Sequence, residues 1–150
     1  MNSDPAPPPP PPDAVLIHAT CVTIEGVGVL LRGPSGSGKS DLALRLIDRG
    51  AELVADDYVH AVAEADGLRV TVPETIAGLI EVRGVGILPR PNRSHATVAL
   101  VIDLGEEERL PDPTTTIIAG VTLPCHRLNP LPASAVIKVE LLLARLKERP

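Results

Sequence analysis

The stretch that decides the fold reads Gly33-Pro34-Ser35-Gly36-Ser37-Gly38-Lys39-Ser40. It matches the phosphate-binding loop (P-loop) pattern G-x-x-x-x-G-K-[ST], whose glycines let backbone N–H groups surround a phosphate without side-chain clashes. A helix starting near Gly38 would direct the positive end of its dipole at that phosphate. Lys39 would bridge the β- and γ-phosphates of ATP, and the Ser40 hydroxyl would ligate Mg²⁺. The alternative is a Gly/Ser loop with no ligand.

The segments on either side have the pattern that a P-loop needs. Apolar residues at 27–31 predict a strand before the loop, and Leu42 and Leu46 repeat at helical spacing after it, until Gly50 ends the predicted helix. We therefore expect an α/β domain over residues 14–150. Its other predicted parts are strands at 15–24, 52–55, 59–63, 68–72, 97–103, 114–118 and 121–123, a Gly-rich stretch at 80–87, a charged loop at 106–113 and a helix at 133–147.

Composition excludes two classes of function. The chain has 150 residues, a formal net charge of −5, no Phe or Trp, and Tyr58 as its only aromatic residue. Proteins that bind single-stranded nucleic acid stack bases on aromatic rings and attract phosphates with positive charge, so we expect no nucleic-acid partner. No apolar run reaches the roughly 18–20 residues of a membrane span, and the N-terminus lacks the features of a signal peptide. These observations predict no membrane partner and a cytoplasmic location.

The N-terminus differs in composition from the rest of the chain. Seven of the 17 prolines fall within residues 5–12. Such a run favours polyproline II and offers no apolar side chains to bury, so residues 1–13 are predicted to be a disordered tail. A docking peptide for a proline-binding module is the alternative.

Two adjacent carboxylates follow the strand predicted at 52–55. In a right-handed strand–helix–strand unit the end of this strand lies near the P-loop. A carboxylate there can hold Mg²⁺ through water, or accept a proton from an attacking hydroxyl. Because neighbouring side chains on an extended chain point to opposite faces, Asp56 and Asp57 are expected to have different tasks, one chemical and one metal-binding or structural. Acids that only cap the strand are the alternative.

Two further features carry weaker signals. His18 lies in the apolar segment before the P-loop and could orient a neighbouring acid, although a packed, hydrogen-bonded histidine is the alternative. The stretch Glu81-Val82-Arg83-Gly84-Val85-Gly86-Ile87 combines glycines with an acid and a base. Glu81 could reach Mg²⁺ and Arg83 could reach a phosphate, while a glycine-rich turn with a surface ion pair is the alternative.

Together these motifs resemble the HPr kinase/phosphorylase family. The resemblance covers residues 14–148, and the chain resembles a short form that comprises only the C-terminal catalytic domain. It implies a P-loop-containing, phosphoenolpyruvate-carboxykinase-like mixed sheet with flanking helices. It also implies an ATP- and Mg²⁺-dependent serine kinase acting on HPr or an HPr-like phosphocarrier of the phosphotransferase system. The resemblance rests on His18-Ala19-Thr20-Cys21-Val22, the P-loop, Leu53-Val54-Ala55-Asp56-Asp57 and the 81–87 stretch.

The resemblance also implies roles for individual residues. Asp57 would be the general base, with His18 beside it, and Lys39 would stabilise the transferring phosphate. Ser40 and Glu81 would hold Mg²⁺, and Arg109 matches an active-site arginine of the family. The signature loop of the family would consist of Glu81, Arg83, Gly84 and Gly86.

The chain departs from the family in one segment that bears on activity. The long form has a basic segment, associated with dephosphorylation, where residues 128–133 of this chain have no basic residue. Kinase activity is therefore expected, while the reverse phosphorylase reaction and a homo-oligomer stay open. Two alternatives remain: a nucleotide-binding regulatory module without transfer activity, and a small-molecule P-loop kinase with Arg90 and Arg93 as candidate lid arginines.

Overall fold

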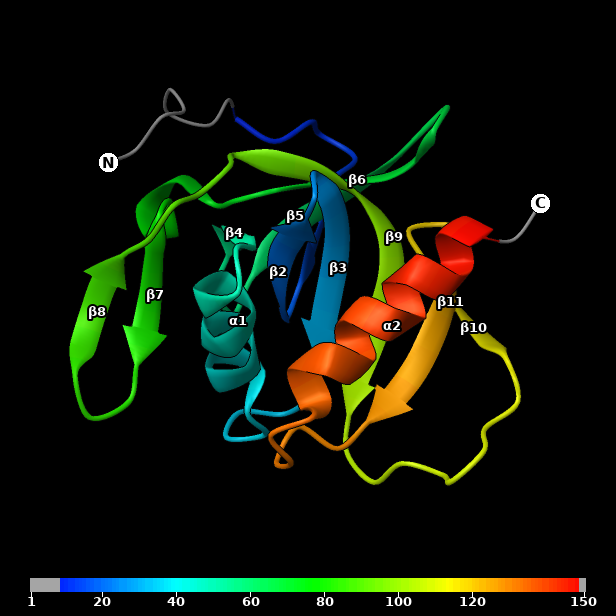
Figure 1. Ribbon diagram of the computed structural model, residues 1–150. Coiled ribbons are helices and arrows are strands. Elements are labelled where there is room, and N and C mark those ends of the chain that lie inside the picture. The colour runs from blue at the N-terminus through cyan, green and yellow to red at the C-terminus, as the bar shows by residue number, and fades with distance from the viewer. Residues whose placement is uncertain (1–8, 149–150) are drawn as a thin grey trace.

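The computed structural model describes residues 9–148 (Figure 1). Residues 1–8 of the predicted tail lie outside the described residues, and residues 9–13 are exposed. In chain order the elements are β1 (Val15–Ile17), β2 (Ala19–Ile24), β3 (Val27–Arg32), α1 (Lys39–Asp48), β4 (Glu52–Ala55), β5 (Val59–Glu64), β6 (Gly67–Thr71), η1 (Glu74–Ile76), β7 (Leu79–Val82), β8 (Gly86–Pro89), β9 (His95–Leu104), β10 (Thr114–Ile118), β11 (Val121–Leu128) and α2 (Ala135–Glu148).

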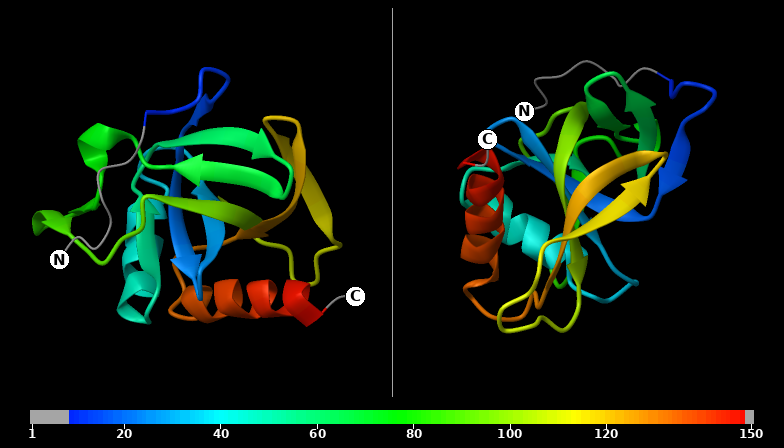
Figure 2. Two further views of the ribbon diagram at one scale, coloured as in Figure 1. Left: turned by 90° about the horizontal axis from the view of Figure 1, so that it is seen from above. Right: turned by 90° about the vertical axis from the view of Figure 1, so that its right-hand side faces the viewer.

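A mixed nine-stranded sheet forms the body of the described structure. The strand order along its main path is β1-β5-β6-β9-β3-β2-β4. In addition, β11 pairs in parallel with β9, and β10 pairs antiparallel with β11. The long strand β9 pairs with β6 through its first half and with β11 through its second half. The sheet therefore curls around β9, as the views in Figure 2 show. This arrangement confirms the expected α/β fold with a mixed sheet and flanking helices.

The two helices lie on one face of the sheet (Figures 1 and 2). Because side chains alternate along a strand, β3 directs Val29 and Leu31 into the core beneath the helices and Leu30 into a second core within the curled sheet. Leu46 of α1 and Leu143 of α2 pack in the helix-side core. Across residues 9–148, neither helix is long and apolar enough to cross a membrane.

The differences from the sequence prediction lie at strand boundaries. The apolar run at 15–24 divides at His18, because β1 pairs with β5 whereas β2 pairs with β3 and β4. The strand predicted at 121–123 extends to Leu128, because it continues pairing along β9. The Gly-rich stretch at 80–87 lies in a separate two-stranded hairpin of β7 and β8.

The order of three strands places the site. β2 pairs antiparallel with both β3 and β4, so β3 and β4 run in the same direction on either side of it. The P-loop follows β3, and Asp56 follows β4. Their carboxyl ends thus meet at one edge of the sheet, as the strand–helix–strand prediction requires.

Candidate active site

The P-loop connects the end of β3 to the start of α1. Gly36 and Gly38 have φ angles of 81° and 103°, in the left-handed region that glycine adopts at little cost. A Cβ atom on Gly33 would lie 2.5 Å from Ser37 Oγ, so a larger residue there would have to displace the Ser37 side chain. The Ser37 hydroxyl is buried and has no hydrogen-bond partner within residues 9–148. A buried hydroxyl without a partner is costly, and a phosphate oxygen in the loop would supply one.

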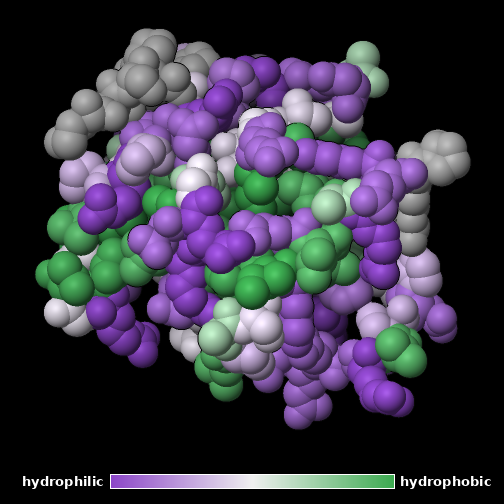
Figure 3. Space-filling model, viewed as in Figure 1, coloured by the Kyte–Doolittle hydropathy of each residue, from purple (hydrophilic) through white to green (hydrophobic). Residues whose placement is uncertain are grey.

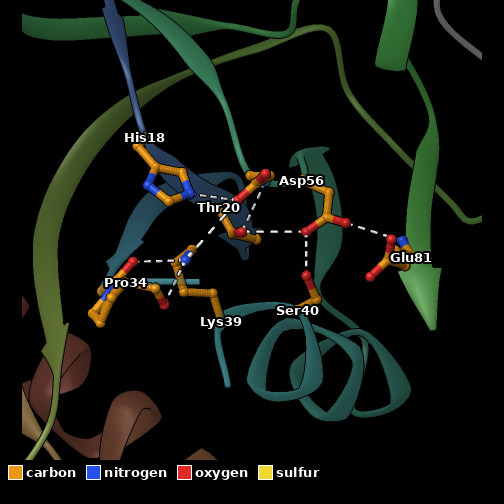
Figure 4. Close-up of polar contacts among 9 residues, drawn as sticks. His18, Thr20, Pro34, Lys39, Ser40, Asp56 and Glu81 are labelled. Atoms are coloured by element: carbon orange, nitrogen blue, oxygen red, sulfur yellow. Dashed lines mark hydrogen bonds and ion pairs between the residues drawn. The ribbon is translucent and has the colours of Figure 1, made fainter. Parts of the chain in front are cut away.

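Lys39 is held inside this loop. Its side chain is 5% exposed, and its Nζ donates hydrogen bonds to the carbonyl oxygens of Gly33 at 2.6 Å and Pro34 at 3.2 Å (Figure 4). The same Nζ lies 4.0 Å from Asp57 Oδ1. A buried ammonium group needs such partners. A phosphate that enters the loop would therefore meet a positive charge that is already in position.

Asp56 is the buried member of the acid pair. Its Oδ1 accepts hydrogen bonds from the Ser40 hydroxyl at 2.6 Å and the Thr20 hydroxyl at 3.2 Å. Its Oδ2 accepts a hydrogen bond from the backbone N–H of Glu81 at 2.9 Å. Figure 4 shows these three contacts converging on one carboxylate. Asp56 thus joins α1, β2 and β7, which fits the metal-binding or structural task expected of one of the two acids.

Asp57 faces the opening instead. Its side chain is 49% exposed. Its φ angle of 73° lies in the left-handed region, so the backbone turns sharply at this residue. Its Oδ1 lies 2.6 Å from Nε2 of His18, which comes from the junction of β1 and β2. The backbone N–H of Asp57 donates to the Thr20 hydroxyl oxygen at 3.0 Å. The structure therefore brings His18, Lys39 and Asp57 together with an accessible carboxylate at the centre.

The residues beside the P-loop fit a magnesium ion bound together with phosphates. Within residues 9–148, no group of three or more His, Cys, Asp or Glu side chains is arranged to hold a metal ion. Mg²⁺ commonly takes one or two protein oxygens and fills its other positions with water and substrate phosphates. Ser40 and Asp56 offer such oxygens next to the loop. Glu81 contributes its backbone N–H to Asp56, and its side chain is exposed beside this pair.

The predicted signature loop lies in the β7–β8 hairpin. Glu81 stands in β7, which packs beside α1, and Arg83 and Gly84 form the turn. Gly84 and Gly86 have φ angles of 86° and 139°, so the turn requires glycine at both positions. Figure 3 shows apolar side chains gathered over this hairpin, and the exposed ones include Leu79, Val85 and Ile87. Of the signature residues, Glu81 contacts Asp56, Arg83 and Gly84 lie in the exposed turn, and Gly86 begins β8.

Arg109 lies in a different place. It lines a groove of about 910 Å³ between the loop at 105–113 and α2, together with His126, Leu142 and Arg145. Burial, followed by the positive charge of Arg145, lowers the pKa of His126. No hydrogen bond or ion pair within residues 9–148 connects Arg109 to Lys39 or Asp57. The catalytic role of Arg109 thus stays a prediction.

A second charged group supports the base of the P-loop, and sequence reasoning missed it. Arg32, the residue before Gly33, forms two hydrogen bonds with Asp103 of β9, Nε–Oδ1 at 2.7 Å and Nη2–Oδ2 at 3.0 Å. Cys125 donates its thiol proton to Asp103 Oδ2 at 3.2 Å. The partners are 71 residues apart in the chain, and only the parallel pairing of β3 with β9 brings them together. Sequence spacing gives no sign of this contact.

Comparison with known proteins agrees with this geometry. The family described as HPr Serine kinase C-terminal domain matches residues 13–109, which include the P-loop, the acid pair and the β7–β8 hairpin. An HPr kinase/phosphorylase from Geobacillus sp. (strain WCH70) is 45% identical over 96 residues, 59% of this chain and 31% of that protein. One from Clostridium novyi (strain NT) is 50% identical over 76 residues, 50% of this chain and 24% of that protein. The chain therefore spans about a third or less of the length of these curated relatives.

A solved structure matches over a larger share. The HPr(Ser) kinase/phosphatase structure from Coxiella burnetii superposes with a TM-score of 0.78 at 29% sequence identity. The match covers 89% of this chain and 96% of that chain. Since the family also matches more than half of this sequence, the chain belongs to the family of HPr serine kinase C-terminal domains.

Proposed function

We propose that this chain is an ATP- and Mg²⁺-dependent kinase that phosphorylates a serine of HPr or of an HPr-like phosphocarrier of the phosphotransferase system. The observation that carries the proposal is the position of Asp57. Its half-exposed carboxylate lies 4.0 Å from Lys39 at the P-loop and is open to a second substrate. The names of the relatives supply the identity of that substrate.

The chemistry follows from these positions. The P-loop N–H groups and Lys39 would bind the phosphates, and Ser40, Asp56 and Glu81 would hold Mg²⁺, which neutralises phosphate charge when bound. The serine oxygen forms a bond to the γ-phosphorus while its proton passes to Asp57. The bond between the γ-phosphorus and the β–γ bridging oxygen breaks, and ADP leaves. His18, through its contact with Asp57, keeps the receiving oxygen in place. Positioning and electrostatics dominate because the transition state of phosphoryl transfer is loose.

Two exposed arginines extend this proposal beyond the P-loop. Arg83 and Arg109 are both exposed, and neither has a hydrogen bond or ion pair within the part of the chain described here. We assign Arg109 to the catalytic set and Arg83 to the signature loop on the family resemblance. Exposed guanidinium groups without a partner suit contacts with phosphate or with an acidic protein surface.

A small-molecule kinase fits the structure less well. Its candidate lid arginines would have to be free to close over a substrate. Arg93 pairs with Glu52 at 2.7 Å, and Glu52 begins β4 at the end opposite Asp56. The backbone N–H of Arg90 is bonded to the carbonyl oxygen of Gly78. These contacts fix the Arg93 side chain at the start of β4 and the backbone of Arg90 beside Gly78.

The test is transfer of labelled phosphate. The purified chain is incubated with γ-labelled ATP, Mg²⁺ and HPr, and the modified residue is identified by mass spectrometry. We expect one phosphoserine, no label on HPr whose target serine is replaced by Ala, and no label without Mg²⁺. Nucleotide binding without any label on HPr would favour the regulatory module, and ATP consumption with small hydroxylated metabolites alone would favour the small-molecule kinase. Adding inorganic phosphate to phosphorylated HPr tests the reverse reaction.

A further inference from the structure

The only aromatic residue of the chain lies at the proposed site. Tyr58 follows Asp57, and its ring stacks on the imidazole of His18, with ring centroids 5.1 Å apart and an angle of 27° between the planes. Aromatic rings normally contribute to cores because they bury a large apolar area. Tyr58 is 43% exposed, so burial in the core does not account for its position. The contact that distinguishes Tyr58 from an ordinary exposed side chain is the stack of its ring on the His18 imidazole.

The turn that contains the acid pair fixes the position of this ring. The backbone N–H of Tyr58 donates to the carbonyl oxygen of Asp56 at 2.9 Å, across the left-handed residue Asp57. Asp56 is in turn held by the Ser40 and Thr20 hydroxyls. The ring of Tyr58 is therefore attached to the same rigid turn as the carboxylate of Asp57.

The imidazole of His18 depends on few contacts. Its side chain is 37% exposed, and it stands between two short strands rather than in a packed core. Within residues 9–148, its hydrogen bonds consist of the one between Nε2 and Asp57 Oδ1. A single hydrogen bond leaves the ring free to rotate about the Cα–Cβ and Cβ–Cγ bonds and to change which nitrogen faces Asp57. The stack against Tyr58 restricts that rotation.

We propose that Tyr58 is a positioning residue that holds the His18 imidazole in the plane that keeps Nε2 against Asp57. The expected effect of Tyr58 on phosphoryl transfer passes through His18, and this part rests on the proposed function. The expected effect of Tyr58 on the orientation of the imidazole is independent of the proposed function. The aromatic ring of Tyr58, and not its hydroxyl, carries the role, because no hydrogen bond of that hydroxyl is found in the described structure.

The kinetic test compares two substitutions at this position. Tyr58→Leu removes the ring, and we expect kcat for transfer to HPr to fall about three- to tenfold with KM for ATP unchanged, the range that an aromatic pair is worth. Tyr58→Phe keeps the ring and should retain wild-type kcat. In a His18→Ala background, Tyr58→Leu should have no further effect, since a residue acting through His18 loses its effect with it. A further loss of similar size in that background would overturn the proposal.

An NMR measurement decides the proposal without any transfer reaction. In ¹⁵N-labelled protein, neutral His18, assigned by comparison with His18→Ala, should carry its proton on Nε2, the nitrogen that donates to Asp57. Tyr58→Phe should keep this tautomer, and Tyr58→Leu should show a mixture of the two tautomers and lose the upfield ring-current shift of the imidazole protons. A single Nε2–H tautomer in Tyr58→Leu would refute the positioning role. If wild-type protein labels no HPr, the proposed function fails, and this readout still tests Tyr58.

Discussion

Two regions of the described chain have charged groups beside an opening, and the fold holds them differently. At the P-loop, Lys39 is nearly buried and bonded to two carbonyl oxygens, and Asp56 accepts three hydrogen bonds. In the groove beside α2, Arg109 and Arg145 are exposed, and their guanidinium groups form no hydrogen bond or ion pair within residues 9–148. Glu107 is the anchored group there, bonded to Lys138 at 2.7 Å and to the Asn129 N–H at 3.1 Å.

This difference indicates that the charged groups at the P-loop suit the chemical step, whereas those in the groove suit recognition of a partner. Charges fixed before the substrate arrives need little reorganisation during the reaction, which is the arrangement that electrostatic catalysis requires. Exposed and unpaired arginines can adjust to the surface of a partner, but solvent screens them. We therefore expect substitutions at the P-loop to affect the rate of transfer strongly, and substitutions in the groove to affect it weakly.

The largest difference between the two regions is expected from the same substitution made once in each. Lys39→Met removes the positioned charge and should lower the single-turnover rate of transfer by about 10²- to 10³-fold. Lys138→Met removes a lysine of the groove, 38% exposed, and should change that rate by less than about threefold. Rapid-quench measurements with labelled ATP provide the comparison. Equal losses in the two variants would remove the distinction between the regions.

Loss of the buried acid should act on stability. Asp56→Ala leaves the Ser40 hydroxyl, the Thr20 hydroxyl and the Glu81 N–H without their acceptor. We expect the free energy of unfolding to fall by about 2–4 kcal/mol, as is typical when buried donors lose a charged partner. Urea denaturation followed by circular dichroism measures it, with Asp56→Asn as the matched control, because the amide retains one acceptor oxygen and should lose less. If the free energy of unfolding of Asp56→Ala equals that of the wild-type protein, the three hydrogen bonds to Asp56 do not stabilise this turn.

Arg109 should have an intermediate effect. Arg109→Gln removes an exposed charge that the family resemblance places in the catalytic set, and we expect about a tenfold lower rate of transfer with unchanged ATP affinity, because solvent screens the exposed guanidinium. The matched control is Arg145→Gln, which removes the other unpaired arginine of the groove and should change the rate less. A loss as large as that of Lys39→Met would mean that the loop at 105–113 brings Arg109 to the P-loop during the reaction.

The Arg32–Asp103 pair should have a smaller, pH-dependent effect. Burial alone would raise the pKa of Asp103, but the hydrogen bonds from Arg32 and Cys125 and the nearby positive charges outweigh it and hold this pKa below its ordinary 3.8. The ionised carboxylate thus stabilises the fold above pH 3.8, and this contribution is lost as the pH falls below that value. Asp103→Asn should therefore cost about 1 kcal/mol at neutral pH, a figure reduced for solvent screening since both side chains are partly exposed.

Thermal unfolding of wild type and Asp103→Asn across the acid range checks this prediction. The difference between the two proteins should be present at pH 7 and shrink in acid. A difference that is independent of pH would indicate that packing, and not the charge of Asp103, stabilises the base of the P-loop.

The same contrast explains how far the sequence predicts the molecule. The P-loop residues are contiguous, and the strand–helix–strand pattern places Asp56 and Asp57 beside them, so this part follows from local spacing. The sequence does not reveal which acid is buried, because the donors of Asp56 come from β2 and β7. Long-range contacts such as Tyr58 with His18 leave no periodic signal.

The groove was harder to predict for a different reason. The position of Arg109 depends on the course of the loop at 105–113, which has neither the periodicity of a strand nor that of a helix. The topology of the sheet determines where strand ends meet. The position of a loop depends instead on contacts with other parts of the chain, which the loop sequence does not indicate.

The rate of transfer by Asp57→Asn tests the central claim most directly. This substitution keeps the size of the side chain and removes the proton acceptor beside His18 and Lys39. We predict a loss of about 10²- to 10⁴-fold in the single-turnover rate with labelled ATP and HPr, with ATP affinity and unfolding free energy close to wild type, as expected for a general base. A rate of labelling equal to that of the wild-type protein would contradict the assignment of Asp57 and, with it, the proposed mechanism at the P-loop.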